Sequence, residues 1–293
     1  MPMKRVSICI ATCNRNEMLS RCLKSICQAN RSDNYEYFVV VIDNNDEPNS
    51  ECVVSSFKES MEFIYDWERK PGIPFARNRC LKHALDINSD FIAFLDDDEW
   101  VEPDWLINIV AAVDKDEVDV VSGGVNQEKN GRIFSKRAFN SIVSRNIAET
   151  DNVIFKSWIA EELSFDEDFA QTGGSDAMFF RRAIELGAKI KSCPGAIATE
   201  EMPISRQGMR WRLQRHFRYG MTHCMIERKL EYGASPFFLV IRGLILIPVG
   251  GFEYIINFAL GGGEKAKKGI DRIMRGLGSL SYFLGVRYNE YKR

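Results

Sequence analysis

Short apolar runs alternate with longer segments of helical periodicity through the first part of the chain. The runs are apolar at consecutive positions, which is typical of strands buried on both faces of a sheet. In the segments between them, apolar residues recur at the spacing of a helix that packs on one face. This alternation predicts an α/β fold with a mostly parallel, doubly wound sheet. The predicted strands are residues 6–11, 37–42, 61–67, 91–95 and 118–124, and the predicted helices are 17–29, 75–85 and 103–113.

The fourth predicted strand ends in four consecutive acids, Asp96, Asp97, Asp98 and Glu99. Open α/β sheets bind their ligands at the carboxyl ends of the strands, so these side chains form a candidate binding site. The four charges repel one another, and we therefore expect a cation among them. Carboxylate oxygens next to a phosphate suit Mg²⁺ or Mn²⁺. A solvated acidic turn is the alternative interpretation, but the position directly after a buried strand favours a metal site.

Charge is distributed unevenly along the 293 residues. Residues 206–293 hold 16 of the 39 basic and 6 of the 41 acidic residues, which leaves 23 basic and 35 acidic residues in the rest of the chain. The acidic part suits a metal site, and the basic part suits phosphates or an anionic membrane surface. Hydrophobic and charged contents of 45% and 27% are those of an ordinary globular protein with a sizeable core.

The eight cysteines show no Cys-x-x-Cys pair and no zinc spacing, and several lie within apolar runs. Free cysteine behaves there as a small hydrophobic residue. Residues 1–5 lead directly into the first strand without the pattern of a signal peptide. We therefore expect reduced thiols and a cytoplasmic protein.

Four motifs follow one another in a fixed order: residues 8–15 (ICIATCNR), 41–44 (VIDN), 72–78 (GIPFARN) and 94–98 (FLDDD). In this order they resemble the family 2 glycosyltransferases, which have the GT-A fold, a Rossmann-like sheet flanked by helices, and use nucleotide-activated sugars. Residues 94–106 and 172–187 look most similar to the bacterial glucosyltransferases of succinoglycan-type exopolysaccharide assembly.

The resemblance covers roughly residues 6–220. It implies a catalytic domain over residues 1–220, followed by a C-terminal helical segment over residues 221–293. The composition of that segment makes it a candidate for association with a membrane interface, as argued below.

The resemblance also implies a donor site at the strand ends, with Thr12 and Asp43 framing the nucleotide base and ribose. Arg77 would contact the nucleotide, and Asn78 would hold its loop. Helix N-terminal solvation or capping is the alternative role for both. Asp96 would bind the ribose. The donor-site residues implied in this way are Thr12, Arg15, Asp43, Arg77, Asn78, Asp96 and Asp97.

The same resemblance assigns the metal ligand and the catalytic base. Asp98 would bind the ion, which bridges the donor's two phosphates and stabilises the departing nucleoside diphosphate. Asp176 would deprotonate the acceptor hydroxyl, which attacks the anomeric carbon opposite the diphosphate and inverts its configuration. Many relatives carry Glu-Asp where this chain has Ser175-Asp176, so the essential carboxylate is kept. Capping of the helix that ends at Gly187 is the alternative role for either residue.

Aromatic and arginine side chains add candidate acceptor and phosphate contacts. Trp100, beside the acids, and Trp158 are candidates to stack on acceptor sugar rings, although packing is the ordinary role of Trp. Trp158 lies in residues 126–163, where the pattern is too irregular to assign elements. Arg206 and Arg210 lie in a segment with five arginines and are candidate ligands of a diphosphate, either of the donor or of a lipid-linked acceptor. A solvated basic helix face is the alternative for the arginines.

The chain from Pro236 to Leu260 is highly apolar but is interrupted by Arg242, Pro248 and Glu253, which makes it a poor spanning helix. A basic segment with interleaved apolar residues follows at residues 265–277. Together they predict helices that lie in a membrane interface. A pair of helices packed on the catalytic domain or on a partner subunit is the alternative. We expect a protein peripheral to the cytoplasmic face of the inner membrane.

Three functions fit these patterns to different degrees. The expected one is an inverting glycosyltransferase that moves a sugar from a nucleotide-sugar, expected to be a UDP-sugar, to a glycan or a polyprenyl-diphosphate-linked oligosaccharide in cell-surface polysaccharide synthesis. A sugar-phosphate nucleotidyltransferase would need a glycine-rich loop with a basic residue after the first strand, and residues 12–16 contain no glycine. A non-enzymatic scaffold that binds metal or membrane gives no reason for the positions of Asp43, Arg77 and Asp176. We expect no nucleic acid partner.

Overall fold

The computed structural model of the chain describes residues 3–115, 117–129, 131–135 and 148–286. The chain divides into two compact units. The first comprises Met1–Ala170 and Ser175–Glu201, and the second comprises Gln171–Gly174 and Met202–Arg293.

One mixed β-sheet organises the first unit. It contains β1 (Lys4–Thr12), β2 (Tyr35–Asp43), β3 (Glu62–Trp67), β4 (Phe91–Phe94), β5 (Glu99–Val101), β6 (Val120–Lys129), β7 (Arg132–Ser135), β8 (Val153–Lys156) and β9 (Ile190–Glu201). Their order is β3-β2-β1-β4-β8-β6-β9-β5, with β7 paired with β6. The half from β3 to β4 is parallel, as predicted. Beyond it the directions mix, because β8 is antiparallel to both β4 and β6 while β6 and β9 are parallel.

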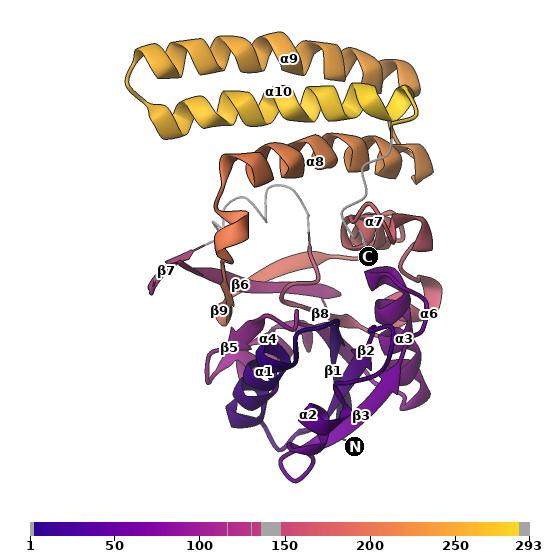
Figure 1. Ribbon diagram of the computed structural model, residues 1–293. Helices are drawn as coiled ribbons and strands as arrows, with labels where there is room; N and C mark the ends of the chain where they lie inside the picture. Colours follow the sequence, from indigo (N-terminus) through magenta and orange to yellow (C-terminus); the bar gives the residue numbers. More distant parts are fainter. Residues whose placement is uncertain (1–2, 116, 130, 136–147, 287–293) are drawn as a thin grey trace. The chain divides into compact units, whose positions relative to one another are not determined.

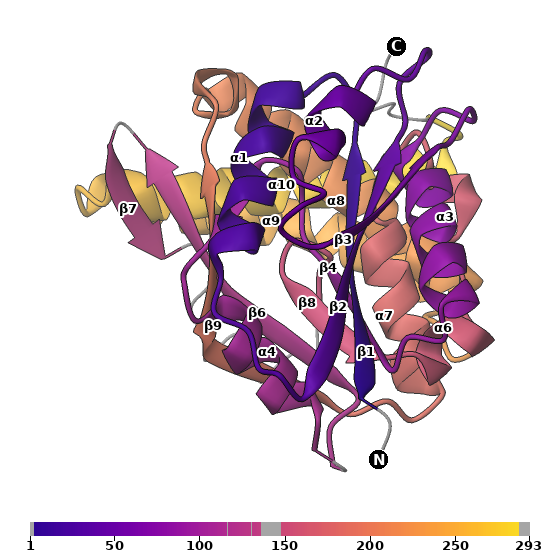
Figure 2. The same ribbon diagram turned by 90° about the horizontal axis from the view of Figure 1, so that it is seen from below.

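Helices cover both faces of this sheet, which is why its central strands are apolar at consecutive positions (Figure 2). One core lies between the sheet and three helices, α1 (Asn16–Gln28), α2 (Glu51–Ser55) and α4 (Trp105–Val113). A second core lies between the sheet and α3 (Ile73–Asp86), α6 (Trp158–Glu162) and α7 (Ser175–Glu185). The helix expected to open at Pro103 begins at Trp105, with Asp104 at its N-cap position.

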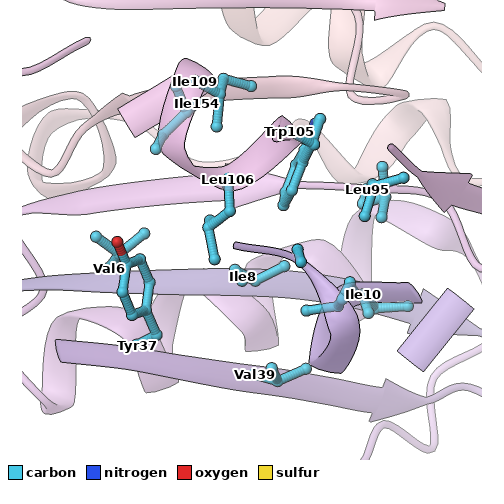
Figure 3. Close-up of a cluster of buried hydrophobic side chains, with 14 of the residues drawn as sticks. Val6, Ile8, Ile10, Tyr37, Val39, Leu95, Trp105, Leu106, Ile109 and Ile154 are labelled. Carbon is cyan, nitrogen blue, oxygen red and sulfur yellow. The ribbon is translucent and has the colours of Figure 1, made fainter. Parts of the chain in front are cut away.

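Trp105 is the largest side chain of the first core and is fully buried. Figure 3 shows it with Leu106 and Ile109 of the same helix, facing apolar side chains of β1 and β2. Its Nε1 donates a hydrogen bond of 2.8 Å to Oδ1 of the buried Asn152. The Asn152 amide in turn donates to the carbonyls of Gly124 and Ala196, at 2.8 and 2.9 Å. The indole therefore completes a polar bridge between strands inside an otherwise apolar layer.

Three helices make up most of the second unit: α8 (Met209–Lys229), α9 (Pro236–Ala259) and α10 (Gly263–Phe283). Within this unit α10 packs against both of the others, and α9 and α10 form an antiparallel hairpin (Figure 1). Glycines allow the two backbones to approach closely. A Cβ added at Gly250 would lie 2.6 Å from the Gly269 carbonyl oxygen, and one added at Gly276 would lie 2.8 Å from that of Gly243. Such small-residue contacts are typical of tightly packed helix pairs, including those of membrane proteins.

Helix α9 continues through Arg242, Pro248 and Glu253 as a single helix. Its polar side chains lie on one side, where Glu253 pairs with Arg272 of α10 at 3.3 Å. Large apolar side chains of the other side are exposed, among them Phe252 at 68%. Among the described residues, α9 is the helix long and apolar enough to cross a membrane, with a mean hydropathy of 1.8.

We expect Trp105→Phe to lower the free energy of unfolding by roughly 1–3 kcal/mol, because the Asn152 Oδ1 atom would lose its donor in a dry core. Urea unfolding followed by far-ultraviolet circular dichroism measures the change. Ile107→Val, on the same helix but 37% exposed, is the matched control and should change the stability by less than about 0.5 kcal/mol. Equal losses in the two variants would contradict this role of the indole.

Candidate active site

The carboxyl ends of three parallel strands meet at one edge of the sheet. Thr12, the last residue of β1, pairs with Asp43, the last residue of β2. On the other side of β1, Cys9 pairs with Phe94 of β4, and the acids follow two residues later. The structure therefore brings together the predicted residues Thr12, Asp43 and Asp96, although each comes from a different motif.

Asp97 and Asp98 both accept hydrogen bonds from Arg15, which lies between β1 and α1. The Arg15 Nη1 atom is 2.9 Å from Asp97 Oδ1 and 3.0 Å from Asp98 Oδ2. Asp97 is buried and also accepts from the Thr12 hydroxyl at 2.8 Å. Burial alone would lower the pKa of Arg15, but the neighbouring Asp97 and Asp98 raise it above its ordinary value. The guanidinium thus stays charged. It neutralises much of the negative charge of residues 96–99, which we call the acid turn.

Asp96 faces a second arginine and is the most exposed of the three aspartates. Its Oδ1 atom lies 3.6 Å from Arg77 Nη2. Partial desolvation raises the pKa of Asp96 to about 7, the attraction of Arg77 opposes the shift, and the charges of Asp98 and Asp151 add to it. A cation beside Asp96 would hold it in the ionised form.

Glu99, the fourth acid of the run, closes the turn. It is buried, and its Oε2 atom accepts a hydrogen bond from the Asp96 backbone N–H at 3.1 Å. The Glu99 N–H donates back to the Asp96 carbonyl at 3.2 Å. Glu99 therefore shapes the backbone of the turn that carries Asp96, Asp97 and Asp98.

The carboxylate oxygens of the acid turn are suitable ligands for a divalent cation. Mg²⁺ is commonly held by one or two carboxylates together with phosphate oxygens of the substrate. Asp98 and Asp96 can supply the carboxylates. In the part of the chain that the structure describes, no three His, Cys, Asp or Glu side chains gather closely enough to hold an ion by themselves. Phosphate oxygens of a bound substrate would have to supply the remaining ligands.

Asp43 directs its carboxylate into its own loop. Its Oδ1 atom accepts from the N–H of Asn45, and its Oδ2 atom accepts from the N–H groups of Asn49 and Ser50 and from the Tyr65 hydroxyl, all at 2.9 Å. Burial would raise the pKa of Asp43, but these four hydrogen bonds lower it below its ordinary value. In this structure Asp43 therefore fixes the loop that follows β2.

The adjacent Asn44 connects that loop to the start of α3. Its Nδ2 atom donates to the carbonyls of Glu68 and Lys70, both at 2.8 Å, and its Oδ1 atom accepts from the Gly72 N–H at 3.0 Å. Gly72 has a φ of 133°, which a residue with a Cβ rarely adopts. These contacts fix the first turn of the helix that carries Arg77.

Arg77 joins the acid turn to the start of α7. The side chain is buried, and its Nη1 atom donates to Ser175 Oγ at 3.4 Å. Asn78, the next residue, holds Phe165 through reciprocal hydrogen bonds of 2.9 and 2.7 Å. Asp176, the predicted base, is the second residue of α7 and is half-buried. One arginine therefore contacts an acid of the predicted donor site and the residue next to the predicted base.

The remaining candidates lie on other elements. The Arg21 guanidinium carbon lies 3.4 Å from the centroid of the Trp100 ring and covers one of its faces. Trp158 lies toward the opposite end of β4 from the acids, because β8 runs antiparallel and its last residue pairs with Phe91. Arg206 and Arg210 belong to the second unit.

Asp151 is a site residue that the sequence did not reveal. It precedes β8, and since Val153 pairs with Phe94, it lies at the acid end of the sheet. It is buried, and its charge acts on Asp96. The available signal was the polar triplet at residues 150–152 directly before an apolar strand, within a region where we had assigned no elements.

A strand-end acid turn between two arginines, beside a helix that opens with Ser-Asp, fits the GT-A class of α/β folds. Residues 7–184 match the family described as Glycosyl transferase family 2, and the chain belongs to this family. It is therefore a glycosyltransferase, and the nucleotidyltransferase and scaffold alternatives are set aside.

Known proteins agree with this assignment. Succinoglycan biosynthesis protein ExoM of Rhizobium meliloti (strain 1021) is 29% identical over 247 residues, which are 80% of this chain and 79% of that protein. The mannosyltransferase PcManGT from Pyrobaculum calidifontis, solved with GDP-Man and Mn²⁺, has a TM-score of 0.68 at 17% identity and covers 97% of this chain and 88% of its own. S. aureus TarS 1–349, solved with UDP, has a TM-score of 0.57 at 15% identity, with 97% and 93% covered. The predicted GT-A fold and family resemblance are confirmed.

We expect Asp43→Asn to lower the free energy of unfolding at pH 7 by roughly 1–3 kcal/mol, because the amide cannot accept all four hydrogen bonds. The folded pKa of Asp43 lies below its ordinary value, so its stabilising effect is complete well above about pH 4 and is lost as the pH falls through the folded pKa.

The free energy of unfolding is measured from about pH 7 to about pH 3. The difference between wild type and variant should become smaller as the pH falls. Glu47→Gln, an exposed position of the same loop, is the control and should show little gap at any pH. A gap for Asp43→Asn that stays constant with pH would contradict the assigned role.

Proposed function

We propose that the protein transfers a sugar, with inversion, from a nucleoside-diphosphate sugar to a glycan of cell-surface polysaccharide synthesis. The expected donor is a UDP-sugar, and the expected acceptor is an oligosaccharide on a polyprenyl diphosphate. The proposal rests on one observation: Arg77 contacts both Asp96 of the acid turn and Ser175, the residue next to Asp176 at the start of α7. The similarity to the succinoglycan biosynthesis protein ExoM supports it, as do the UDP, GDP-Man and Mn²⁺ bound in similar structures.

On the donor side, the chain would orient the nucleotide at the ends of β1 and β2 and the diphosphate at the acid turn. Thr12 and the loop held by Asp43 would border the base and ribose. Asp98, with Asp96 beside it, would hold Mg²⁺ or Mn²⁺. That ion, when bound, would neutralise negative charge on the leaving nucleoside diphosphate. Arg206 and Arg210 of the second unit are proposed as further diphosphate ligands.

On the acceptor side, Asp176 would act as the general base. Its position at the start of α7, next to the Ser175 that contacts Arg77, supports this role. Only one base is needed, because a single displacement transfers the sugar directly and inverts the anomeric carbon. Asp151 is buried, and its charge acts on Asp96. It is proposed to border the transferred sugar. Trp100 is proposed as an acceptor contact through the ring face that Arg21 does not cover.

A screen of nucleotide-sugars for metal-dependent release of nucleoside diphosphate would identify the donor and test the activity. With that donor, Asp176→Asn should lower transfer by about 10²–10⁴-fold while leaving donor affinity near that of wild type. Glu185→Gln, an exposed acid of the same helix, is the matched control and should transfer normally.

A collapse of donor affinity with normal transfer from bound donor would move Asp176 to the donor site. In the same assay, Asp98→Ala should abolish metal-dependent transfer. Full activity of Asp98→Ala, or of wild type after thorough chelation, would contradict the metal assignment.

We also propose that the α9–α10 hairpin seats the protein on the cytoplasmic face of the inner membrane, where a lipid-linked acceptor is confined. The exposed apolar side of α9 supports hydrophobic attachment. Exposed lysines of α10, including Lys265 and Lys268, support attraction to anionic headgroups of about 1 kcal/mol each.

The full chain should therefore sediment with anionic vesicles and be only partly released by high salt, since salt screens the charges but not the apolar contacts. The double variant Phe252→Asp/Ile255→Asp should stay largely in solution. Ile133→Asp/Phe134→Asp, which changes two exposed apolar residues of β7, is the control and should sediment like wild type. Equal sedimentation of all three proteins would show that α9 is not the attachment surface.

A further inference from the structure

Arg15 occupies an unusual position for a predicted substrate ligand, because its guanidinium lies on two carboxylates of its own chain. One nitrogen, Nη1, donates to both Asp97 and Asp98. The backbone around it is anchored: the Asn14 N–H donates to Asn45 Oδ1, and the Arg15 carbonyl accepts the first hydrogen bond of α1 from Leu19. The Arg15 side chain nevertheless remains 37% exposed. It can therefore turn toward solvent without movement of the main chain.

The two carboxylates depend on Arg15 to different degrees. Asp97 keeps a second donor, the Thr12 hydroxyl, when the guanidinium leaves. For Asp98, the only hydrogen-bond donor within the described part of the chain is Arg15. The Asp98 side chain is also slightly more open than that of Asp97, at 12% against 5%. Removal of Arg15 would thus release one carboxylate, Asp98, while Asp97 stays in place.

A divalent cation and the Arg15 guanidinium would compete for Asp98, because two cations about 3–4 Å apart repel each other in a partly buried site. Metal binding at Asp98 would therefore weaken the interaction between Arg15 and Asp98 that the present structure shows.

We propose that Arg15 is a built-in counter-ion of the acid turn, which a divalent cation displaces from Asp98. Arg15 is then a positioning residue that sets the metal affinity of the site. It holds the Asp97 and Asp98 side chains in place before the metal arrives, and the need to displace it raises the metal concentration required for occupancy. This inference rests on the proposed metal role of Asp98.

Mn²⁺ binding to the full-length protein in the presence of UDP, whose phosphates can complete the coordination, tests the proposal without any assay of transfer. It is measured by electron paramagnetic resonance of the free ion, with Mn²⁺ and UDP without protein as the blank. Arg15→Gln keeps a polar side chain but removes the charge. We expect it to bind Mn²⁺ about tenfold more tightly than wild type, a coupling of ordinary size for two competing ligands. Its thermal midpoint without Mn²⁺ should be lower than that of wild type, and Mn²⁺ should raise it by more.

Two further variants separate the possible failures. Lys24→Gln, an exposed position of α1, removes the same charge away from the acid turn and should leave Mn²⁺ affinity unchanged. Asp98→Asn alone should weaken Mn²⁺ binding. Combined with Arg15→Gln, it should remove the increase in Mn²⁺ affinity that Arg15→Gln causes. If Asp98→Asn weakens binding but Arg15→Gln does not strengthen it, the counter-ion role is wrong and the metal site stands. If Asp98→Asn has no effect, the metal site itself is wrong and the inference fails with it.

Discussion

The neutralisation of three aspartates within one turn is the constraint on which the site depends. Asp96, Asp97 and Asp98 follow a central strand that is covered on both faces, so their charges are held close together and partly out of water. Uncompensated carboxylates in such a place would take up protons or push the turn apart. Two arginines oppose both effects by pairing with these acids, and they come from separate elements, Arg15 before α1 and Arg77 in α3. The charge balance of the turn therefore ties three parts of the chain together.

The two arginines differ in how firmly they are held, and the difference assigns them different roles. Arg77 is buried, stacks near Phe165 and contacts Ser175 as well as Asp96, so its position is fixed by the core around it. Arg15 is anchored through its backbone alone, and its side chain reaches the acids across a partly open surface. A buried cation with several partners is a scaffold for the start of α7. A partly exposed cation with two acid partners can be exchanged for another cation.

The sequence predicts the parts of this arrangement that follow from local pattern. Consecutive apolar positions identify β1, β2 and β4, and the parallel order places Thr12, Asp43 and the acids at one edge. It does not predict contacts that depend on strand direction or side-chain choice. Asp151 reaches the acids only because β8 is antiparallel, and Asp43 turns into its own loop because four donors surround it. The cation that the structure places at the acids is the Arg15 guanidinium. This contact joins residues far apart in sequence, so local pattern does not predict it.

The distribution of polar and apolar side chains on the α9–α10 hairpin of the second unit bears on the proposed membrane attachment. Arg242, Pro248 and Glu253 interrupt the apolar run of α9, yet the helix is continuous, and Arg242 and Glu253 lie toward the side of the glycines that contact α10. Glu253 finds its partner in Arg272 of α10, so α9 is tied along its length to a helix rich in lysine. A span by α9 alone would either leave Glu253 unpaired in hydrocarbon or draw the charged α10 in with it, and both are costly. A hairpin with one apolar side and one polar side is instead suited to lie flat at the interface, with the exposed side of α9 in the acyl boundary.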